Sequence, residues 1–358
     1  MRLRTAPALP SGSRPLLTPG RVGAALGMLL VVGAVASAPA AATPPEVLAH
    51  EREASPVATY GGAVAWSSYD ARTRRWRLKA RVGGRVGTVP VASRPYAFDV
   101  DLGPGRGGGL SAVYSRCREA RGPRGSAVAE YACDVFEYDF GKKRERRRRD
   151  LSRRGYDETL PSVWRGRVAF ARRPTSRNGS FQPSRLFVAT AGGRLRAVGG
   201  GSRGADDEVD QLGAAPTAVE LRGHRLAFSW TLLSSPGSCE EDPKIGFTVT
   251  DELWLVDLGG ARRRVAVGCQ FDELSGFGSV SLTAGSLFAT VHRRVQEPAG
   301  ERIATRLARY SPRGAPEGEV DLTPSSSGFA VSQDGRDTWR FLDEPSGRVA
   351  LVRSRLFE

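Results

Sequence analysis

The chain has 358 residues, 40% hydrophobic and 25% charged, and this composition excludes a disordered chain because it supplies apolar surface for one large domain or two ordinary ones. The formal net charge is +15, which points to an acidic partner such as nucleic acid, anionic lipid or a cell-wall polymer. Only four of the 53 basic residues are lysines. Because the arginines are spread over the whole length, the skew is as typical of a GC-rich genome as of phosphate binding.

The first 42 residues are typical of a secretory signal peptide. A basic stretch precedes the apolar run Val22 to Ala36, and small residues follow as far as Ala42. The apolar run is shorter than the roughly 20 residues that a transmembrane helix needs, so cleavage is favoured over retention as an anchor. We therefore predict a signal peptide over residues 1–42, a flexible mature N-terminus over 43–55, and a secreted protein of the cell envelope without a membrane span.

Export affects how the four cysteines are interpreted. An even number of cysteines in an oxidising compartment predicts disulfides, and of the three possible pairings we favour Cys117 with Cys133 and Cys239 with Cys269. A metal site is not indicated, because no CxxC motif occurs and the three histidines are scattered along the chain. No cofactor is expected.

Strand-like runs recur at a spacing of roughly 45 to 62 residues after the N-terminal region. Each run follows a glycine or a turn-forming residue, and a second strand-like run follows it. The first runs begin at Gly61, Gly108, Arg165, Arg222, Ala284 and Asp334. Alternating hydrophobicity and glycine-containing turns indicate antiparallel strands. The pattern predicts an all-β protein, a six-bladed β-propeller of four-stranded antiparallel blades.

The repeats resemble the WD-repeat-like units of TolB-type propellers. The resemblance is carried by "LPSVWRGRVAFARR…SRLFVATAGGRLRAV" (Leu160 to Val198) and "FAVSQDGRDTWRFL…SGRVALVRS" (Phe329 to Ser354), and as a loose pattern it extends over residues 56–358. It implies the propeller fold over these residues and no catalytic residues. By analogy of fold, it also implies a protein-docking platform in the cell envelope.

A strongly basic run falls on the last strand of the second repeat. Aligning the repeats places two lysines at a turn and the following arginines on the outermost strand of that blade. Charge on an outer strand prevents edge-to-edge association, and the same charges form a candidate patch for an anionic partner. Nucleic acid is the less favoured anion, because no aromatic residues are interleaved for base stacking. The candidate residues are Lys142, Lys143, Arg144, Arg146, Arg147, Arg148 and Arg149.

Two groups of residues are expected near one mouth of the central channel. Asp157 and Glu158 precede an innermost strand, where paired carboxylates serve acid/base chemistry, bind a hard cation, or form ion pairs with Arg153 and Arg154. In the preceding repeat, Asp99 and Asp101 alternate with Val100 and are expected to form hydrogen bonds between neighbouring blades. A ligand in the channel would meet the side chains of Arg94, Tyr96 and Asp99.

The ends of the chain are expected to close the ring. We predict that the segment from Val57 to Trp66 pairs with the C-terminal repeat. The turn Ser332 to Trp339 resembles the Asp-box turn of sialidase-type propellers, with Gly335 one position early, and such turns are structural.

Two functions follow from the sequence. The favoured one is an exported, non-catalytic, monomeric scaffold that binds an envelope protein or an acidic cell-surface polymer. The alternative is a propeller hydrolase or lyase acting on an acidic glycan. It is the less favoured because no nucleophile elbow or zinc motif occurs, and only His224 and His292 are plausible imidazole bases.

Overall fold

A computed structural model describes residues 44–120, 129–175, 184–198, 215–234, 248–269, 274–298, 300–322 and 328–355. These residues form six antiparallel four-stranded sheets and contain no helix. Consequently, no helix in the described part of the chain is long and apolar enough to cross a membrane. All the strands belong to one compact unit, which spans residues 43–358.

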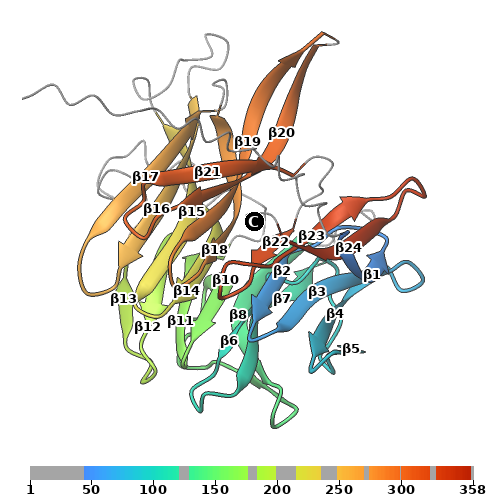
Figure 1. The fold of residues 1–358 in the computed structure, drawn as a ribbon. Helices are drawn as coiled ribbons and strands as arrows, with labels where there is room; N and C mark the ends of the chain where they lie inside the picture. The colour runs from blue at the N-terminus through green and yellow to red at the C-terminus, as the bar shows by residue number, and fades with distance from the viewer. Residues whose placement is uncertain are drawn as a thin grey trace, which may run out of the picture. The chain divides into compact units, whose positions relative to one another are not determined.

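Each sheet is one blade, and the first strand of each blade contacts the first strands of both neighbouring blades, so that six strands surround a central channel (Figure 1). From the channel outwards, blade 1 contains β2 (Val57–Tyr60), β3 (Ala63–Asp70), β4 (Arg75–Val82) and β5 (Arg85–Thr88). Blade 2 contains β6 (Asp101–Pro104), β7 (Leu110–Ala120), β8 (Ala129–Asp139) and β9 (Arg144–Arg147). Blade 3 contains β10 (Tyr156–Trp164), β11 (Arg167–Pro174), β12 (Arg185–Ala189) and β13 (Leu195–Ala197).

Blades 4 and 5 contain β14 (Ala215–Arg222), β15 (Arg225–Ser234), β16 (Thr248–Asp257) and β17 (Arg262–Cys269); and β18 (Leu274–Leu282), β19 (Leu287–Glu297), β20 (Gly300–Tyr310) and β21 (Pro316–Asp321). Blade 6 combines β22 (Phe329–Val331), β23 (Thr338–Asp343) and β24 (Val349–Ser354) with the N-terminal strand β1 (Glu46–Glu51). The six-bladed propeller expected from the repeats is therefore confirmed, and the glycine-led runs correspond to the second strand of each blade.

A buried aromatic residue on the second strand recurs in every blade. These side chains are almost fully removed from solvent and are among the largest buried groups of the protein: Trp66, Tyr114, Phe170, Phe228, Phe288 and Phe341. Each fills the space between neighbouring sheets, which pack face to face around the ring. Truncating such a buried ring to alanine typically costs about 3–5 kcal/mol, so these six positions fix the spacing of the blades.

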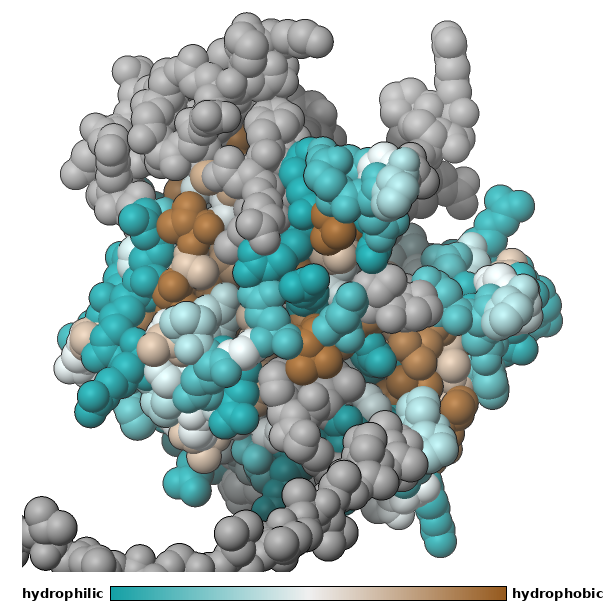
Figure 2. Space-filling view, turned by 45° about the horizontal axis from the view of Figure 1, so that its top comes forward, coloured by the Kyte–Doolittle hydropathy of each residue, from teal (hydrophilic) through white to brown (hydrophobic). Residues whose placement is uncertain are grey.

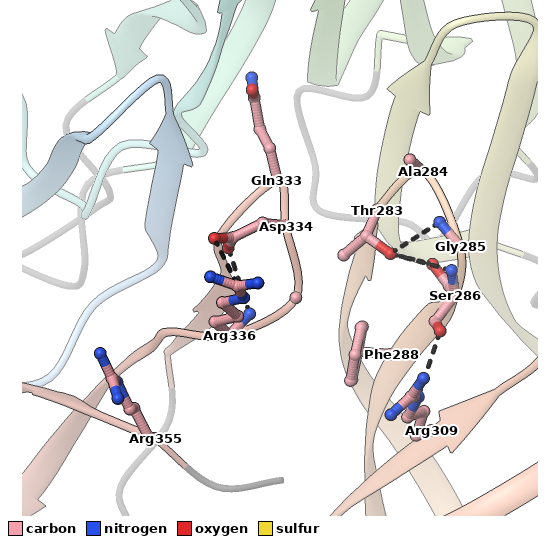
Figure 3. Close-up of a pocket in the computed structure, with 11 residues that line it drawn as sticks. Thr283, Ala284, Gly285, Ser286, Phe288, Arg309, Gln333, Asp334, Arg336 and Arg355 are labelled. Atoms are coloured by element: carbon pink, nitrogen blue, oxygen red, sulfur yellow. Dashed lines mark hydrogen bonds and ion pairs between the residues drawn. The ribbon is translucent and has the colours of Figure 1, made fainter. Parts of the chain in front are cut away.

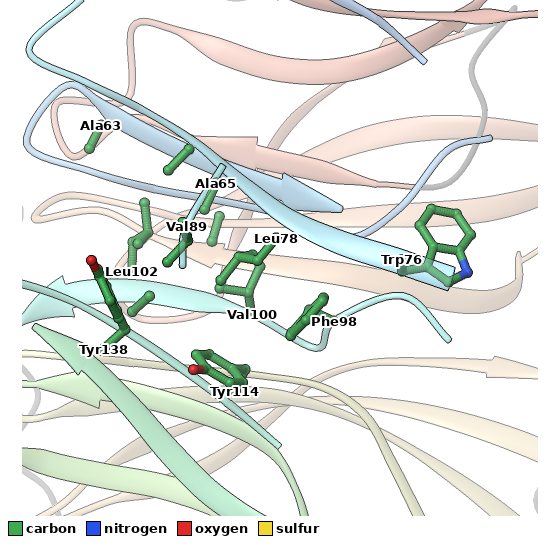
Figure 4. Close-up of a cluster of buried hydrophobic side chains, with 13 residues drawn as sticks. Ala63, Ala65, Trp76, Leu78, Val89, Phe98, Val100, Leu102, Tyr114 and Tyr138 are labelled. Atoms are coloured by element: carbon green, nitrogen blue, oxygen red, sulfur yellow. The ribbon is translucent and has the colours of Figure 1, made fainter. Parts of the chain in front are cut away.

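The cluster between blades 1 and 2 shows how this packing works (Figure 4). Trp76 and Leu78 from β4 contact Phe98 and Val100, which lie on the link that leads into β6, and Tyr114 closes the cluster from β7. The rings of Phe98 and Tyr114 meet edge to face, with centroids 5.4 Å apart. The link between blades is thus part of the core and holds the first strand of blade 2 at the channel.

A disulfide joins Cys117 on β7 to Cys133 on β8, as predicted. Cys269, at the end of β17, is also disulfide-bonded. Cys239, its predicted partner, lies outside the described residues, as do residues 1–43, which contain the predicted signal peptide.

The strand that closes the ring differs from the predicted one. The segment Val57 to Trp66 forms β2 and part of β3 in blade 1, and it packs against blade 6 through side chains without pairing with it. The closing strand is β1, which pairs antiparallel with β24 from Glu46 opposite Arg353 to Glu51 opposite Val349. Residues 46–51 are therefore not a flexible N-terminal segment, and the propeller begins ahead of residue 56.

The buried carboxylate of Glu51 ties this closing strand to blade 1. It accepts hydrogen bonds from Trp66 Nε1 at 2.9 Å and from Ser68 Oγ at 2.7 Å. Glu51 is only 8% exposed, and Trp66 is fully buried. The same side chain therefore holds together the strand β1 of blade 6 and the second strand of blade 1.

Replacing Glu51 with alanine is expected to lower the free energy of unfolding by about 1–3 kcal/mol, because the buried indole N–H of Trp66 loses its acceptor. Denaturant titration of E51A against the wild type measures this loss. The exposed Glu53, which has no hydrogen bond or ion pair among the described residues, provides the control variant E53A, expected within about 0.5 kcal/mol of the wild type. Equal losses in the two variants would contradict the role of Glu51 in closure.

Candidate functional site

The first strands of the blades enclose a cavity of about 150 Å³ on the channel axis. Its polar lining includes the carboxyl side chains of Asp99, Asp101 and Glu220, and within the described chain no lysine, arginine or histidine lines it. The cavity is thus acidic in a protein whose formal net charge is +15. Among the described residues, no group of three or more histidine, cysteine or carboxylate side chains is arranged to hold a metal ion.

Asp99 and Asp101 both form hydrogen bonds from blade 2 to blade 3, as the sequence led us to expect. Asp99 Oδ2 accepts from the amide of Leu160 at 2.8 Å. Asp101 Oδ2 accepts from Ser162 Oγ at 2.7 Å and from the amide of Val163 at 2.8 Å. These carboxylates satisfy backbone donors that would otherwise be unpaired at the channel wall.

The same arrangement is repeated farther around the ring. Ser162 Oγ in turn accepts a hydrogen bond from the amide of Leu221 in blade 4 at 2.7 Å. Glu220 accepts from the hydroxyl of Ser281 in blade 5, and Ser281 Oγ accepts from the amide of Val331 in blade 6 at 3.2 Å. A relay of carboxylate, hydroxyl and amide therefore links blade 2 to blade 4 and blade 4 to blade 6.

Burial raises the pKa values of two carboxyl groups in this relay. Burial raises the pKa of Asp101 to about 6, against the hydrogen bonds from Val163 and Ser162. Burial also raises the pKa of Glu220 to about 7, with the positive charge of Arg222 opposing the rise and the negative charge of Asp101 adding to it. The two carboxyl groups thus interact electrostatically within the channel, and near neutral pH their ionisation is costly.

Aromatic and basic side chains fill the end of the channel at the turns between first and second strands. Tyr60, the last residue of β2, meets Trp164, the last residue of β10, edge to face with ring centroids 5.8 Å apart. The guanidinium of Arg222, at the end of β14, lies 5.7 Å from the centroid of a Trp164 ring and 3.6 Å from Glu220 Oε1. Side chains of blades 1, 3 and 4 thus meet at this end of the channel.

Sequence reasoning missed Glu220 and Arg222. The signal was present, because "VWRGRVAF" (Val163 to Phe170) and "LRGHRLAF" (Leu221 to Phe228) align at their second strands. That alignment places Glu220 at the position of Ser162, which is one of the relay positions on the channel wall.

Arg94 and Tyr96, predicted to meet a channel ligand, lie on the link before β6 and do not line the cavity. Arg94 is 8% exposed, donates from a guanidinium nitrogen to the carbonyl oxygen of Ser115 at 2.8 Å, and lies 3.5 Å from Asp99. Its guanidinium also stacks over the ring of Phe98. These contacts of Arg94 stabilise blade 2. Tyr96, by contrast, is exposed to solvent.

Asp157 does not lie in a solvated loop at the channel mouth. It is the second residue of β10, is 1% exposed, and accepts hydrogen bonds from the amide of Cys133 at 3.2 Å and from Thr175 Oγ1 at 3.0 Å. Its ion-pair partner is Arg173 on the adjacent strand, at 3.5 Å, and not the predicted Arg153 or Arg154.

Glu158 is fully buried beside Asp157. Its Oε1 accepts from Arg172 Nε at 2.9 Å and from the backbone amide of Arg153 at 3.2 Å, while Oε2 has no hydrogen-bond partner among the described residues. Burial raises the pKa of Glu158 to about 7, although Arg172 opposes the rise. Neither Asp157 nor Glu158 lines the channel cavity, so the structure does not bring them together with Asp99 or Arg94.

The part of the basic run from Arg144 to Arg147 lies on β9, the edge strand of blade 2, as predicted, whereas Arg148 and Arg149 follow the strand. Ion pairs neutralise part of the run. The carboxylate of Glu137 forms ion pairs with Arg146 at 2.8 Å and with Arg148 at 3.3 Å, and Arg148 forms a second ion pair with Asp150 at 2.8 Å. Arg148 is 6% exposed, so including it in an exposed patch was wrong. Arg147 similarly pairs with an aspartate. The exposed members without an ion pair in the described chain are Lys143, Arg144 and Arg149.

A second, open pocket of about 450 Å³ lies between the first turns of blades 5 and 6 (Figure 3). The turn from Thr283 to Ser286 forms one wall, and the Asp-box-like turn carrying Asp334 and Arg336 forms the other. Asp334 accepts hydrogen bonds from the hydroxyl of Ser332 and from the amide of Arg336. These bonds, with that from Ser332 first, hold the pKa of Asp334 below its usual value.

The two histidines named as possible bases lie apart. His224 is largely exposed in the turn between β14 and β15, 3.8 Å from Asp257. His292 is half-buried on β19, and burial lowers its pKa while the charge of Asp251 opposes that change. Neither lines the channel cavity or the pocket of Figure 3.

Comparison with known proteins gives similarity of structure only. No protein-family model matches the sequence, and no curated protein matches it. Among solved structures, TolB from Acinetobacter baumannii is similar over 83% of this chain, with 14% sequence identity and a TM-score of 0.49. The matched region spans 65% of the TolB chain.

Two enzymes are also similar in structure. An α-L-arabinanase from Penicillium chrysogenum matches 88% of this chain and 98% of its own, with 9% identity and a TM-score of 0.48. An oligogalacturonate lyase in complex with manganese matches 82% of this chain and 76% of its own, with 11% identity and a TM-score of 0.42. At such identities a shared propeller architecture carries no information about activity.

The raised pKa values predict that stability falls as the pH rises. Between about pH 4 and pH 7 the folded protein holds protons on Asp101, Glu158 and Glu220 that the unfolded chain has released, so the free energy of unfolding declines over this window. Denaturant titrations at about pH 5 and pH 8 measure this decline. E220Q is expected to reduce it by about 1–2 kcal/mol, and an unchanged pH dependence in E220Q would contradict the assignment.

The contrast between neighbouring arginines of the basic run is also testable. R148A is expected to lower the free energy of unfolding by about 1–3 kcal/mol, because it removes a buried ion pair and leaves Glu137 with fewer donors. R149A, at an exposed position, is expected within about 0.5 kcal/mol of the wild type. Urea titrations of both variants measure the difference, and similar values would show that Arg148 belongs to the exposed patch after all.

Proposed function

We propose that this chain is a non-catalytic binding module of the cell envelope, which holds a protein or an acidic surface polymer. The observation that carries the proposal is the inaccessibility of the carboxylates that catalysis would use. Asp157 is 1% exposed and Glu158 is fully buried. Asp99 and Asp101 accept hydrogen bonds between blades. Asp157 and Glu158 are therefore closed to a substrate, whereas Asp99 and Asp101 line the channel cavity but are already engaged as hydrogen-bond acceptors between blades.

A location outside the cytoplasm is part of this proposal. The disulfide between Cys117 and Cys133 supports it, because disulfides persist in oxidising compartments. The predicted signal peptide, which lies outside the described residues, is consistent with the same location.

The surface supports polar rather than apolar contacts. In Figure 2, which turns the upper side of Figure 1 towards the viewer, hydrophobic residues form separate patches among hydrophilic ones. The large exposed hydrophobic residues of the described chain are few: Val82 and Val86 on blade 1, Val47 on blade 6, Ile303 on blade 5, and Tyr96 on the link between blades 1 and 2. A broad apolar interface of the kind that obligate complexes use is therefore not favoured on the visible face.

For the alternative, cleavage of an acidic glycan, the pocket between blades 5 and 6 is a candidate location. The pocket of Figure 3 combines an accessible carboxylate, Asp334, with Arg309, Arg336 and Arg355. A general base needs a pKa near the working pH, whereas the hydrogen bond from Ser332 moves the pKa of Asp334 in the opposite direction. This pocket therefore suits holding a charged group better than acid/base chemistry.

The decisive experiment is a cleavage assay with polygalacturonate as the acidic glycan. We expect neither new reducing ends, which hydrolysis would produce, nor the ultraviolet absorbance of unsaturated products, which elimination would produce. The wild type and D334N should give the same background. Cleavage by the wild type that is lost in D334N would replace the binding proposal with the glycan-cleaving alternative.

A further inference from the structure

The topology places two sets of turns on one side of blades 1 to 5. Because the strands of a blade alternate in direction, the turn between its first and second strands and the turn between its third and fourth strands lie at the same end of the sheet. Turns of neighbouring blades touch there: a Cβ added at Gly166 would lie 2.9 Å from Cβ of Arg106. Arg225 also donates to the carbonyl oxygens of Thr283 and Ala284 at 2.7 Å. We call this side the turn side.

At least one exposed arginine lies at the turn between the third and fourth strands in each of five consecutive blades, and we consider one arginine from each. Each lies in the turn between the third and fourth strands or on the first residues of the fourth strand, and none has an ion pair among the described residues. This set, the basic collar, contains Arg85, Arg144, Arg194, Arg263 and Arg313. The sixth blade has no such turn, because β1 from the N-terminus is its outer strand.

On the opposite side, where the links between blades run, charges of both signs are mixed. Arg75 pairs with Glu119 at 2.6 Å, and His50 lies 2.7 Å from Glu344. Arg302 pairs with Glu297 on the ribbon that β19 and β20 form at the top of Figure 1. Ion pairs also occur on the turn side, where Lys142 lies 3.5 Å from Asp139 and Arg309 lies 2.8 Å from Glu317. Pairing of this kind lowers the field outside the protein, and the five arginines of the collar have no ion-pair partner among the described residues.

We propose that the basic collar binds an extended polyanion whose repeating phosphate or carboxylate groups contact successive blades. This deepens the proposed binding function and rests on it. Guanidinium groups bind phosphate and carboxylate through paired hydrogen bonds, and their planar donors suit either group. Because the arginines are distributed one to a blade around the ring, a small anion contacts one of them while a long chain contacts several.

An acidic protein is the less suitable occupant of the collar. Tight protein interfaces depend on a few buried anchors, mainly aromatic residues and arginines in desolvated pockets. The one large exposed aromatic residue in the described chain is Tyr96, which lies on a link between blades and not on the turn side. Exposed charges spaced along a rim instead favour many weak contacts that depend on salt.

The test compares two variants that remove the same number of charges from opposite sides. The collar variant carries R85Q, R144Q, R194Q and R263Q. The control variant carries substitutions of exposed arginines on the link side that have no ion pair in the described residues: R52Q, R72Q, R118Q and R154Q. Circular dichroism and thermal unfolding establish that both variants are folded. Binding to polyphosphate and to polygalacturonate is then measured across a salt series, and the two polymers distinguish phosphate from carboxylate as the preferred group.

We expect the collar variant to bind the preferred polymer at least about 10-fold more weakly at low salt, and its salt dependence, log K against log salt, to become less steep by about 2 to 3. The control variant should lose less than about 3-fold. Equal losses in both variants would mean that net charge alone attracts the polymer, and no binding by the wild type would exclude a polyanion as the occupant. Either result would overturn this inference, whereas the proposed binding function would fail only through catalysis in the cleavage assay.

Discussion

Pairing between the two ends of the chain is the constraint on which the propeller depends. Six sheets stacked face to face around an axis have two free faces until the last blade meets the first, and here the last blade obtains its outer strand from residues 46–51. Glu51 then reaches across to Trp66 in blade 1. Hydrogen bonds between strands and a buried side-chain contact between blades therefore act at the same seam, and the channel exists only because that seam is closed.

The channel wall shows how a closed ring uses its polar residues. Inner strands lie close together, and their amides that face the channel wall need acceptors that backbone pairing within a blade does not supply. Asp99, Asp101 and Glu220 supply such acceptors, and all three side chains also line the channel cavity. In an enzyme of this fold, carboxylates at the channel would have to remain free to meet substrate. Here each of them accepts a hydrogen bond from a neighbouring blade and so contributes to the closure of the ring.

The repeat architecture was predictable because it depends on local signals. Glycine-led runs with alternating hydrophobicity mark the second strand of each blade, and the alignment of repeats placed Arg144 on an edge strand and Asp99 at a blade junction. The partners of individual side chains were not predictable. Glu158 is buried by contacts with Arg172, and Arg148 by Glu137, and these contacts depend on how adjacent strands and turns pack.

The closing strand was missed for a related reason. "EVLAHE" (Glu46 to Glu51) is short, half of it is charged or polar, and no glycine turn marks it. The feature that defines it as a strand is its pairing with β24, which lies about 300 residues later in the sequence. Glu220 and Arg222 were missed although their alignment with blade 3 was visible, because single charged residues near a turn are usually solvated.

The closing strand also determines when, during synthesis, the ring of blades can close. Among the described strands β1 is synthesised first and β24 last, so β1 stays without its partner until residues 349–354 have been made. At the usual rates of synthesis this interval is roughly 15–60 s. Through that time any blades already formed carry an open seam, and the short, charged character of β1 keeps its free edge from pairing with other chains. A chain interrupted before β24 remains open at that seam, so ring closure requires that both β1 and β24 have been made.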